Sequence, residues 1–231
     1  MEHNASQQWS QIYTSSSGTE MAFPSEYVIR IFKGKYPRLD LDKASFRGKS
    51  ICDLGCGDGR NMLLLSQCGF EVSGMEIAPE ICQTVTRNLG NCNVNADVRV
   101  GTNDSVPFEE CAFDFLLSWN ACYYMGHNDD FNKHIDEFAR VLKPNGLLVL
   151  SLPKKSCFIY KNCDIHKPGY AVIREDPFNV RQGEILRIFE GESEIETVFS
   201  RHFNNFVFAS IHDDCFGFEY HWHLAVCRKS E

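Results

Sequence analysis

Short apolar runs alternate with segments of helical periodicity along most of the chain. Between the runs, apolar residues recur at helical spacing, as Ile81, Val85 and Leu89 do. Such an alternation is typical of successive βα units around a mainly parallel sheet. The pattern predicts five strands of this kind, at residues 50–54, 70–76, 97–100, 113–118 and 147–152.

Helices are predicted between these strands from their periodicity and from the glycine, proline and aspartate residues at their ends. They are expected at residues 60–68, at 79–90, and from a cap at Asp129 or Asp130 as far as Leu142. A turn over residues 143–146 then separates the last of these helices from the strand that follows.

The two ends of the chain and one inserted segment depart from this rhythm. Residues 1–20 form a polar arm that leads into a helix at 24–33, and a flap is inserted at 153–190. The flap is expected to contain a hairpin with strands at 170–176 and 184–190. The last part of the chain is expected to contain a helix at 192–202 and an antiparallel strand pair at 205–211 and 221–227. The sequence thus predicts a single α/β domain over residues 1–231, with helices in an N-terminal arm at 1–48. Its centre is a Rossmann-like, mostly parallel seven-stranded sheet whose last strand is antiparallel.

Composition narrows the class of protein. Of 231 residues, 43% are hydrophobic, which is enough to bury a core and excludes a disordered chain. The formal net charge of −8 disfavours a general nucleic-acid binder, because acidic surfaces repel phosphate. No apolar run approaches the ~20 residues that span a bilayer, and the first residues lack a secretory pattern. We therefore expect a cytoplasmic protein without a membrane partner.

The eleven cysteines are expected to be free thiols. Their number is odd, no C-x-x-C pair occurs, and Cys52, Cys82, Cys122 and Cys227 lie in apolar segments where a thiol packs as a small hydrophobic group. The pairs that could start a zinc site do not form a ligand set at structural-site spacing. They are Cys52 with Cys56, Cys157 with Cys163, and His221 with His223. We therefore predict no metal site.

A glycine-rich loop follows the first predicted strand. In the segment D-L-G-C-G-D-G, Gly55, Gly57 and Gly59 allow backbone N–H groups to approach a ligand at the start of a helix. Glu76, 17 residues after Gly59, ends the next strand, where a carboxylate can accept hydrogen bonds from ribose hydroxyls. A dinucleotide loop reads G-x-G-x-x-G instead, and Asp53 would oppose a pyrophosphate but suit an ammonium. The residues favour a nucleoside that carries an amino acid.

These residues resemble the class I S-adenosylmethionine-dependent methyltransferases. The resemblance rests on DLGCGDG, the acid in GMEIAPE, GTNDSVPFEECAFD and RVLKPNGLLVLSLP, and it spans roughly residues 50–152. It implies S-adenosylmethionine as cofactor and S-adenosylhomocysteine as product. Asp53 and the loop Gly55-Cys56-Gly57-Asp58-Gly59 would hold the methionine part, Glu76 the ribose, and Ile77 the adenine.

The remaining cofactor contacts are expected on two further strand ends and on the N-terminal arm. The adenine amino group would meet Thr102, Asn103 or Asp104. Ser118, Trp119 and Asn120 leave the fourth strand at the carboxyl edge of the sheet and should line the methyl-donor pocket. Trp9 and Tyr13 either cover the cofactor as a lid or pack on the body of the domain.

Tyr123, Tyr124 and His127 are the predicted acceptor-site residues, and His127 is a candidate general base. Because the acidic chain lacks a basic groove and the flap can close over a compact molecule, we expect a small-molecule acceptor. A protein or RNA methyltransferase is the alternative, although SWNACYY stands where a D/N-P-P-Y element would act on base nitrogens. A regulator that binds the cofactor without turnover would carry the same loop. The oligomeric state is left open.

Overall fold

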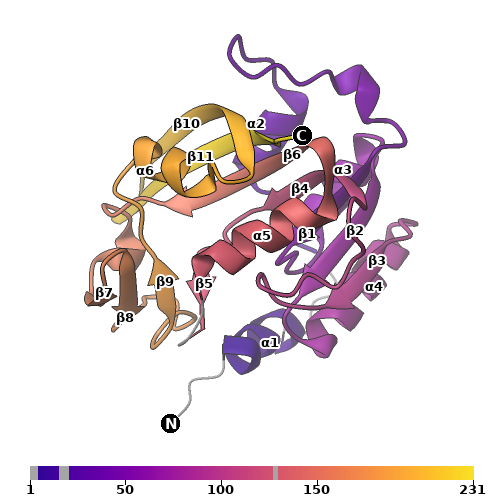
Figure 1. Cartoon of the computed structure of the whole chain (residues 1–231). Coiled ribbons are helices and arrows are strands. Elements are labelled where there is room, and N and C mark those ends of the chain that lie inside the picture. The colour runs from indigo at the N-terminus through magenta and orange to yellow at the C-terminus, as the bar shows by residue number, and fades with distance from the viewer. Residues whose placement is uncertain (1–4, 16–20, 127–129) are drawn as a thin grey trace.

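The computed structural model describes residues 5–15, 21–126 and 130–231. A seven-stranded sheet runs through the molecule in the order β10-β11-β6-β4-β1-β2-β3 (Figure 1). Only the pairs that involve β11 are antiparallel within this sheet. The predicted fold class is confirmed. The strands are β1 (Ser50–Leu54), β2 (Glu71–Glu76), β3 (Asp97–Val100), β4 (Phe113–Ser118), β6 (Leu142–Pro153), β10 (Phe203–Cys215) and β11 (Phe218–Lys229).

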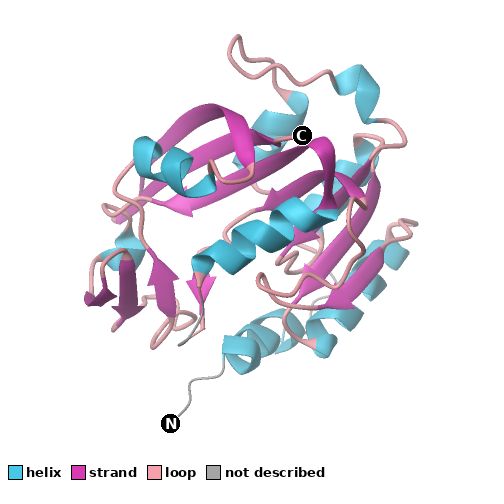
Figure 2. Cartoon of the chain, in the orientation of Figure 1, coloured by secondary structure: helices cyan, strands magenta, loops and turns pink. Residues whose placement is uncertain are grey.

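Helices cover both faces of this sheet (Figure 2). On one face lie α5 (Phe131–Val141) and α6 (Glu192–Phe199), and on the other lie α2 (Glu26–Lys33), α3 (Arg60–Gln67) and α4 (Pro79–Asn91). Short 3-10 helices η1 (Lys43–Phe46) and η2 (Phe158–Tyr160) connect them to neighbouring segments. The stripe expected on α5 is buried, since Phe131, Ile135 and Phe138 are at most 2% exposed. Both faces of the sheet are therefore closed, and its strand ends remain to form a site.

Among the predicted boundaries that differ from the structure are those around residues 142–146. Leu142 begins β6 instead of ending the preceding helix, and the expected turn at 143–146 lies within β6. Its pairing with β4 shifts there, from Phe113–Leu142 to Phe115–Leu147, and Asn145 adopts φ 64°. The turn residues thus form an irregularity inside a longer strand, because the backbone pairs with β4 on both sides of it.

The N-terminal arm is helical, as predicted, and the flap acquires more regular structure than its sequence predicts. Part of the arm is a helix, α1 (Ala5–Ser15). The predicted hairpin of the flap is confirmed as β8 (Tyr170–Ile173) and β9 (Ile185–Arg187), and it extends into a four-stranded sheet of order β5-β9-β8-β7. Neither β5 (Tyr124–Met125) nor β7 (Cys163–Lys167) was expected. Because β5 follows the end of β4, this pairing ties the flap to the carboxyl edge of the main sheet.

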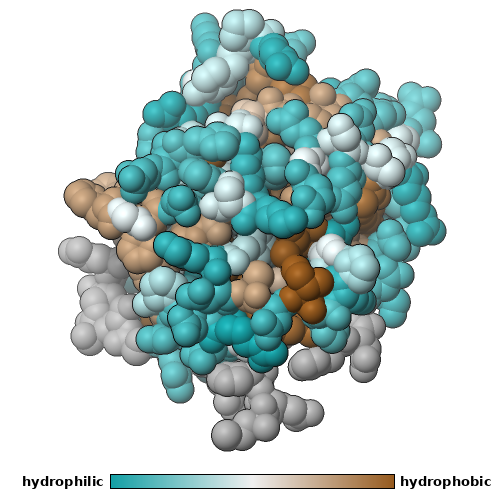
Figure 3. All heavy atoms as spheres, turned by 90° about the vertical axis from the view of Figure 1, so that its left-hand side faces the viewer, coloured by the Kyte–Doolittle hydropathy of each residue, from teal (hydrophilic) through white to brown (hydrophobic). Residues whose placement is uncertain are grey.

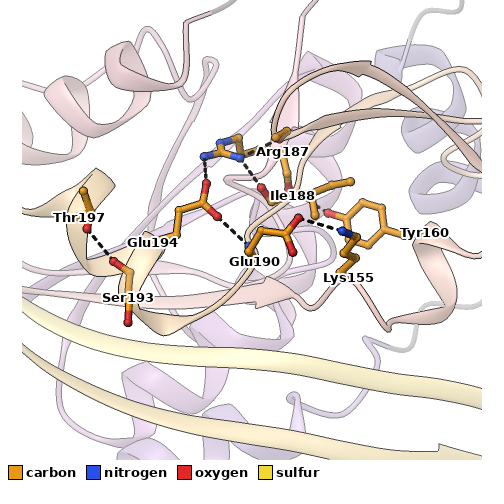
Figure 4. A network of polar contacts seen from close by, with 9 residues as sticks. Lys155, Tyr160, Arg187, Ile188, Glu190, Ser193, Glu194 and Thr197 are labelled. Atoms are coloured by element: carbon orange, nitrogen blue, oxygen red, sulfur yellow. Dashed lines mark hydrogen bonds and ion pairs between the residues drawn. The ribbon is translucent and has the colours of Figure 1, made fainter.

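A network of polar contacts around Arg187 fixes the base of the flap (Figure 4). The Arg187 guanidinium is almost fully buried and donates to the Gly169 carbonyl at 2.8 Å and to the Glu194 carboxylate at 2.6 Å. Glu194 also accepts the Glu190 N–H at 2.7 Å, and the Tyr160 hydroxyl donates to the Arg187 carbonyl at 2.9 Å. Charged hydrogen bonds of this kind are stronger than neutral ones, so β9 is held firmly against α6.

The face that carries the flap is covered mainly by hydrophilic side chains, with hydrophobic ones in small groups (Figure 3). None of the helices that the structure describes is long and apolar enough to cross a bilayer. The eleven cysteines are free thiols, and the four expected in apolar segments, Cys52, Cys82, Cys122 and Cys227, are buried. Burial raises the pKa of the Cys122 thiol to about 12, which makes it an unreactive packing group.

Candidate active site

A cavity of about 1050 Å³ lies at the carboxyl edge of the parallel strands. Residues that directly follow β1, β2 and β4 form its floor, α1 forms one wall, and the flap forms another. In open α/β sheets ligands bind at this edge, where the strand order reverses. The residues that line the cavity include Trp9, Tyr13, Gly55, Cys56, Gly57, Arg60, Asn61, Glu76, Ile77, Thr102, Asn103, Asp104, Trp119, Asn120, Tyr124, His134, Arg174, Arg181 and Glu184.

The glycine loop has a backbone that other residues adopt with strain. Gly55, Gly57 and Gly59 have φ of 69°, 62° and 87°, all in the left-handed region. A Cβ on Gly57 would lie 2.8 Å from the Tyr13 hydroxyl, and one on Gly55 would lie 2.7 Å from the Cβ of Ala121. The loop therefore forms a closely covered cradle whose backbone faces the cavity.

Glu76 ends β2 with its carboxylate held by the loop. One carboxylate oxygen accepts the Gly57 N–H at 2.7 Å, and the other accepts the Ile77 N–H at 3.0 Å. Burial raises the pKa of Glu76, and these two hydrogen bonds oppose that rise. Each oxygen keeps a further lone pair, so the carboxylate can accept two hydroxyl donors from the cavity. Ile77 is 38% exposed beside it and offers an apolar surface.

Asp53 is buried without a partner. It is 1% exposed, and neither carboxylate oxygen has a hydrogen-bond partner among the described residues. Burial and the neighbouring charge of Glu76 raise its pKa. Asp53 lies behind the loop and does not itself line the cavity. An uncompensated buried carboxylate is costly, and a cationic ligand held against the loop would compensate it.

The loop after β3 presents polar groups on the opposite side. The Thr102 hydroxyl donates to the Asp104 carboxylate at 2.6 Å, and the Asn103 side-chain amide donates to the Ala121 carbonyl at 3.2 Å. Thr102, Asn103 and Asp104 all line the cavity. Asp104 is the stronger acceptor for an amino group, because its carboxylate is charged and the Thr102 hydroxyl is neutral.

The residues at the end of β4 and directly after it either line the cavity or are buried beneath it. Trp119 and Tyr124 line the cavity, whereas Ser118 and Tyr123 are fully buried and do not. The Tyr123 ring stacks on the Tyr124 ring at 5.0 Å and so fixes its orientation from behind. Ser118 and Tyr123 were expected to face ligand and instead pack in the core. His127, the predicted base, lies outside the described residues.

Two aromatic rings of α1 cover the cavity. Trp9 stacks on Tyr13 at 5.8 Å and meets the edge of Tyr124 at 6.1 Å. Burial and the nearby charge of Glu76 raise the pKa of Tyr13, so its hydroxyl stays neutral. The rings thus reach from the glycine loop to β5 in the flap sheet, and α1 is a wall of the site.

Several cavity residues were not predicted. Arg60 and Asn61 begin α3 directly after the loop, and the Asn61 side chain accepts the Ser25 N–H at 3.0 Å. Both residues could have been predicted from their position at the start of a helix, directly after a glycine loop. Arg181 and Glu184 come from the flap, where only the alternation that begins at Glu184 hints at an inward side chain.

The sequence of this region matches a known domain. Residues 51–146 match the family described as a methyltransferase domain. A sterol 4-C-methyltransferase, strm-1, of Caenorhabditis elegans is 29% identical over 100 residues, which cover 42% of this chain and 29% of that protein. A ubiquinone biosynthesis O-methyltransferase of Xanthomonas oryzae is 31% identical over 115 residues, covering 49% and 45% of the two chains. The chain spans less than half the length of these relatives.

Solved structures share the fold. An S-adenosylmethionine-dependent methyltransferase of Methanosarcina mazei has a TM-score of 0.65 at 20% identity and covers 85% of this chain and 98% of its own. A putative methyltransferase of Haloferax volcanii, solved with the activator Trm112, has a TM-score of 0.63 at 16% identity, covering 99% and 98%. Residues 51–146 therefore match a methyltransferase domain, and the chain shares its fold with these solved structures.

Proposed function

We propose that this chain binds S-adenosylmethionine and transfers its methyl group to a small-molecule acceptor, with S-adenosylhomocysteine as the second product. The observation that carries the proposal is a cavity lined by a glycine cradle and the Glu76 carboxylate, with the unpartnered Asp53 buried behind that loop. This set matches a ligand that has a backbone-binding end, vicinal hydroxyls and a positive charge. The match of residues 51–146 to a methyltransferase domain agrees with it.

The residues present fit this cofactor. Asp53 would compensate its ammonium, the loop would bind its methionine part, and Glu76 would accept its ribose hydroxyls. Ile77 would pack on the adenine ring, and Asp104, oriented by Thr102, would accept from the adenine amino group. When bound, the cofactor supplies a methyl group already activated on a sulfonium. The chain's own task is then to align an acceptor and exclude water, which is worth up to ~7–11 kcal/mol.

The acceptor would occupy the part of the cavity between Trp119, Tyr124 and the flap. A volume of about 1050 Å³ has room for a nucleoside and a compact second molecule. The ring of Trp9 above Tyr124 narrows the entrance there. Two relatives named for sterol and ubiquinone chemistry are consistent with a small acceptor.

RNA is the second candidate acceptor. A probable tRNA methyltransferase 9B of Mus musculus is 28% identical over 103 residues, which cover 45% of this chain and 21% of that protein. The formal charge of −8 argues against a backbone-binding surface, because phosphate recognition relies on lysine and arginine. We therefore rank RNA below a small molecule.

Methyl-labelled S-adenosylmethionine, incubated with the protein and a cell extract, tests the proposal. We expect label in the small-molecule fraction, and label in RNA or protein would overturn the choice of acceptor. Glu76→Ala should abolish the label, whereas Glu80→Ala, at the exposed start of α4, should retain it. Tight binding of S-adenosylhomocysteine without any labelled product would indicate a regulator instead of an enzyme.

A further inference from the structure

Glu184 places a buried, unpartnered carboxylate in the flap wall of the cavity. It is 9% exposed and lines the cavity, and its Oε1 has no hydrogen-bond partner in the part of the chain that the structure describes. Burial raises its pKa to about 7. None of the proposed cofactor contacts involves Glu184, which lies on the flap and not on the strand ends.

The backbone around Glu184 is well fixed. Its N–H donates to the Arg181 carbonyl at 2.9 Å, and its carbonyl accepts the Ile173 N–H from β8 at 3.0 Å. Three residues later, Arg187 anchors β9 through the network in Figure 4. The carboxylate is therefore presented from a rigid hairpin, which is the support that a binding group requires.

Arg181, three residues before Glu184, is already paired with another carboxylate. The Arg181 guanidinium lies 3.3 Å from the Asp176 carboxylate, and Asp176 also accepts the Val180 and Arg181 N–H groups at 2.8 and 3.0 Å. Among the described residues, burial is the sole cause of the raised pKa of Glu184, so no ion pair with Arg181 offsets it. Glu184 thus keeps an unmet need for a positive or proton-bearing partner.

Aromatic rings and two arginines, Arg174 and Arg181, share this end of the cavity with Glu184. Burial raises the pKa of Tyr124 on β5 to about 12, with the Arg181 charge opposing the rise and the Glu184 carboxylate adding to it, so its phenol stays protonated. Trp119 lines the same space, and the remaining titratable lining groups are Arg174 on the flap and His134 on α5, whose Nδ1 lies 3.2 Å from the Cys122 carbonyl. A carboxylate beside aromatic rings is a suitable environment for an organic ammonium.

We propose that the acceptor is a compact amine and that Glu184 binds its ammonium group and removes a proton from it. In this step the N–H bond breaks, an O–H bond forms on the Glu184 carboxylate, and the electron pair remains on nitrogen as the lone pair that attacks. A neutral alcohol would gain one hydrogen bond here, whereas a carboxylate acceptor would be repelled. The inference rests on the proposed methyl transfer and names its acceptor class.

A panel of compact amines tests this, each matched with the alcohol and the carboxylate of the same carbon skeleton. Binding is measured by calorimetry to protein saturated with S-adenosylhomocysteine. We expect at least one amine to bind tenfold or more tightly than its matched alcohol. That preference should be lost in Glu184→Gln and kept in Glu175→Gln, an exposed position on the same flap. The amine's affinity should rise with pH through about 7 in the wild type, as Glu184 ionises, and stay flat in Glu184→Gln.

Three results would overturn the inference: no amine binds, the matched alcohols or carboxylates bind better, or the amine preference survives Glu184→Gln. His127→Ala serves as a comparison, because the sequence predicts a base there. If that variant alone abolishes methyl transfer to a bound amine, the proton passes to His127 and Glu184 is not the base. Binding of S-adenosylhomocysteine is read first, so failure of cofactor binding remains distinct from failure of the amine assignment.

Discussion

Two buried carboxylates at neighbouring strand ends, Asp53 on β1 and Glu76 on β2, differ in how the protein compensates their charge. The Glu76 carboxylate accepts hydrogen bonds from two backbone N–H groups, so its orientation is already fixed when a ligand binds. Asp53 has no hydrogen-bond partner among the described residues, so its buried charge is left uncompensated by them. The first carboxylate is preorganised for hydrogen bonding, and the second makes binding of a cation favourable.

Glu76→Ala tests the first of these roles. The change removes the acceptors for two hydroxyl groups, so affinity for S-adenosylmethionine should fall by more than ~1.5 kcal/mol, the scale of a hydrogen bond to a charged group. Isothermal titration calorimetry measures this directly. Glu80→Ala provides the matched control at the exposed start of α4. Equal affinities for the two variants would contradict the assignment of Glu76.

Glu184 should make the ligand-free protein less stable as pH rises. Its pKa is about 7 in the folded chain against 4.5 without burial, so between these values the unfolded state loses its proton first. Stability is therefore unaffected by this group below pH 4.5 and declines up to about pH 7. Glu184→Gln should remove this decline. The decline amounts to at most about 2 kcal/mol in the free energy of unfolding, after allowance for solvent screening through the cavity.

Urea unfolding at acidic and alkaline pH measures this effect. The stability advantage of Glu184→Gln over the wild type should be larger at pH ~8 than at pH ~5. Glu175→Gln, which removes an exposed carboxylate of the same flap, should show no such change with pH. An advantage that is identical at both pH values would mean that Glu184 is solvated in the folded protein.

At the scale of elements, the cavity exists because α1 and the flap meet across the strand ends. Trp9 on α1 contacts Tyr124 on β5, and β5 pairs with β9. The sequence predicts neither contact, because the arm has a polar pattern and β5 is only two residues long. The helices and strands with a clear hydrophobic periodicity were predicted well. The elements that were not predicted are those that become regular only through pairing with segments elsewhere in the chain.

Trp9→Ala tests whether α1 acts as a lid. The change removes two ring contacts worth roughly 0.5–1.5 kcal/mol each, so S-adenosylhomocysteine should bind about tenfold more weakly and dissociate faster. Stopped-flow measurement of dissociation gives the rate. Gln11→Ala, on the exposed side of α1, is the control and should leave the rate unchanged. If Trp9→Ala does not alter dissociation, α1 packs on the domain without covering the ligand.

For the molecule as a whole, the charge of −8 sets an expectation for its partner. A small acceptor that meets one carboxylate should show a weak dependence on salt, because its contact is short and shielded. We expect the KM for the acceptor to change less than about threefold between ~50 and ~200 mM salt, whereas a polynucleotide would lose ~10³-fold or more in affinity. Steady-state kinetics at the two salt concentrations decide between them.

The sequence by itself determined the strands of the main sheet, the α/β class, the glycine loop and Glu76. Each of these depends on local information: apolar runs specify strands, and a sharp turn after a strand requires glycine at positive φ. Glu76 was predictable because a residue that ends a parallel strand lies at the ligand-binding edge whatever surrounds it. The resemblance to class I methyltransferases rests on these same local features.

Only the tertiary structure decided which side chains enclose the ligand. Ser118 and Tyr123 were predicted to line the site yet are fully buried, while Glu184, which was not predicted, comes from the distant flap and lines the cavity. Burial, pKa and the lack of a charge partner arise from contacts between segments that lie far apart along the chain. No local pattern specifies those contacts, and they set the chemistry of the site.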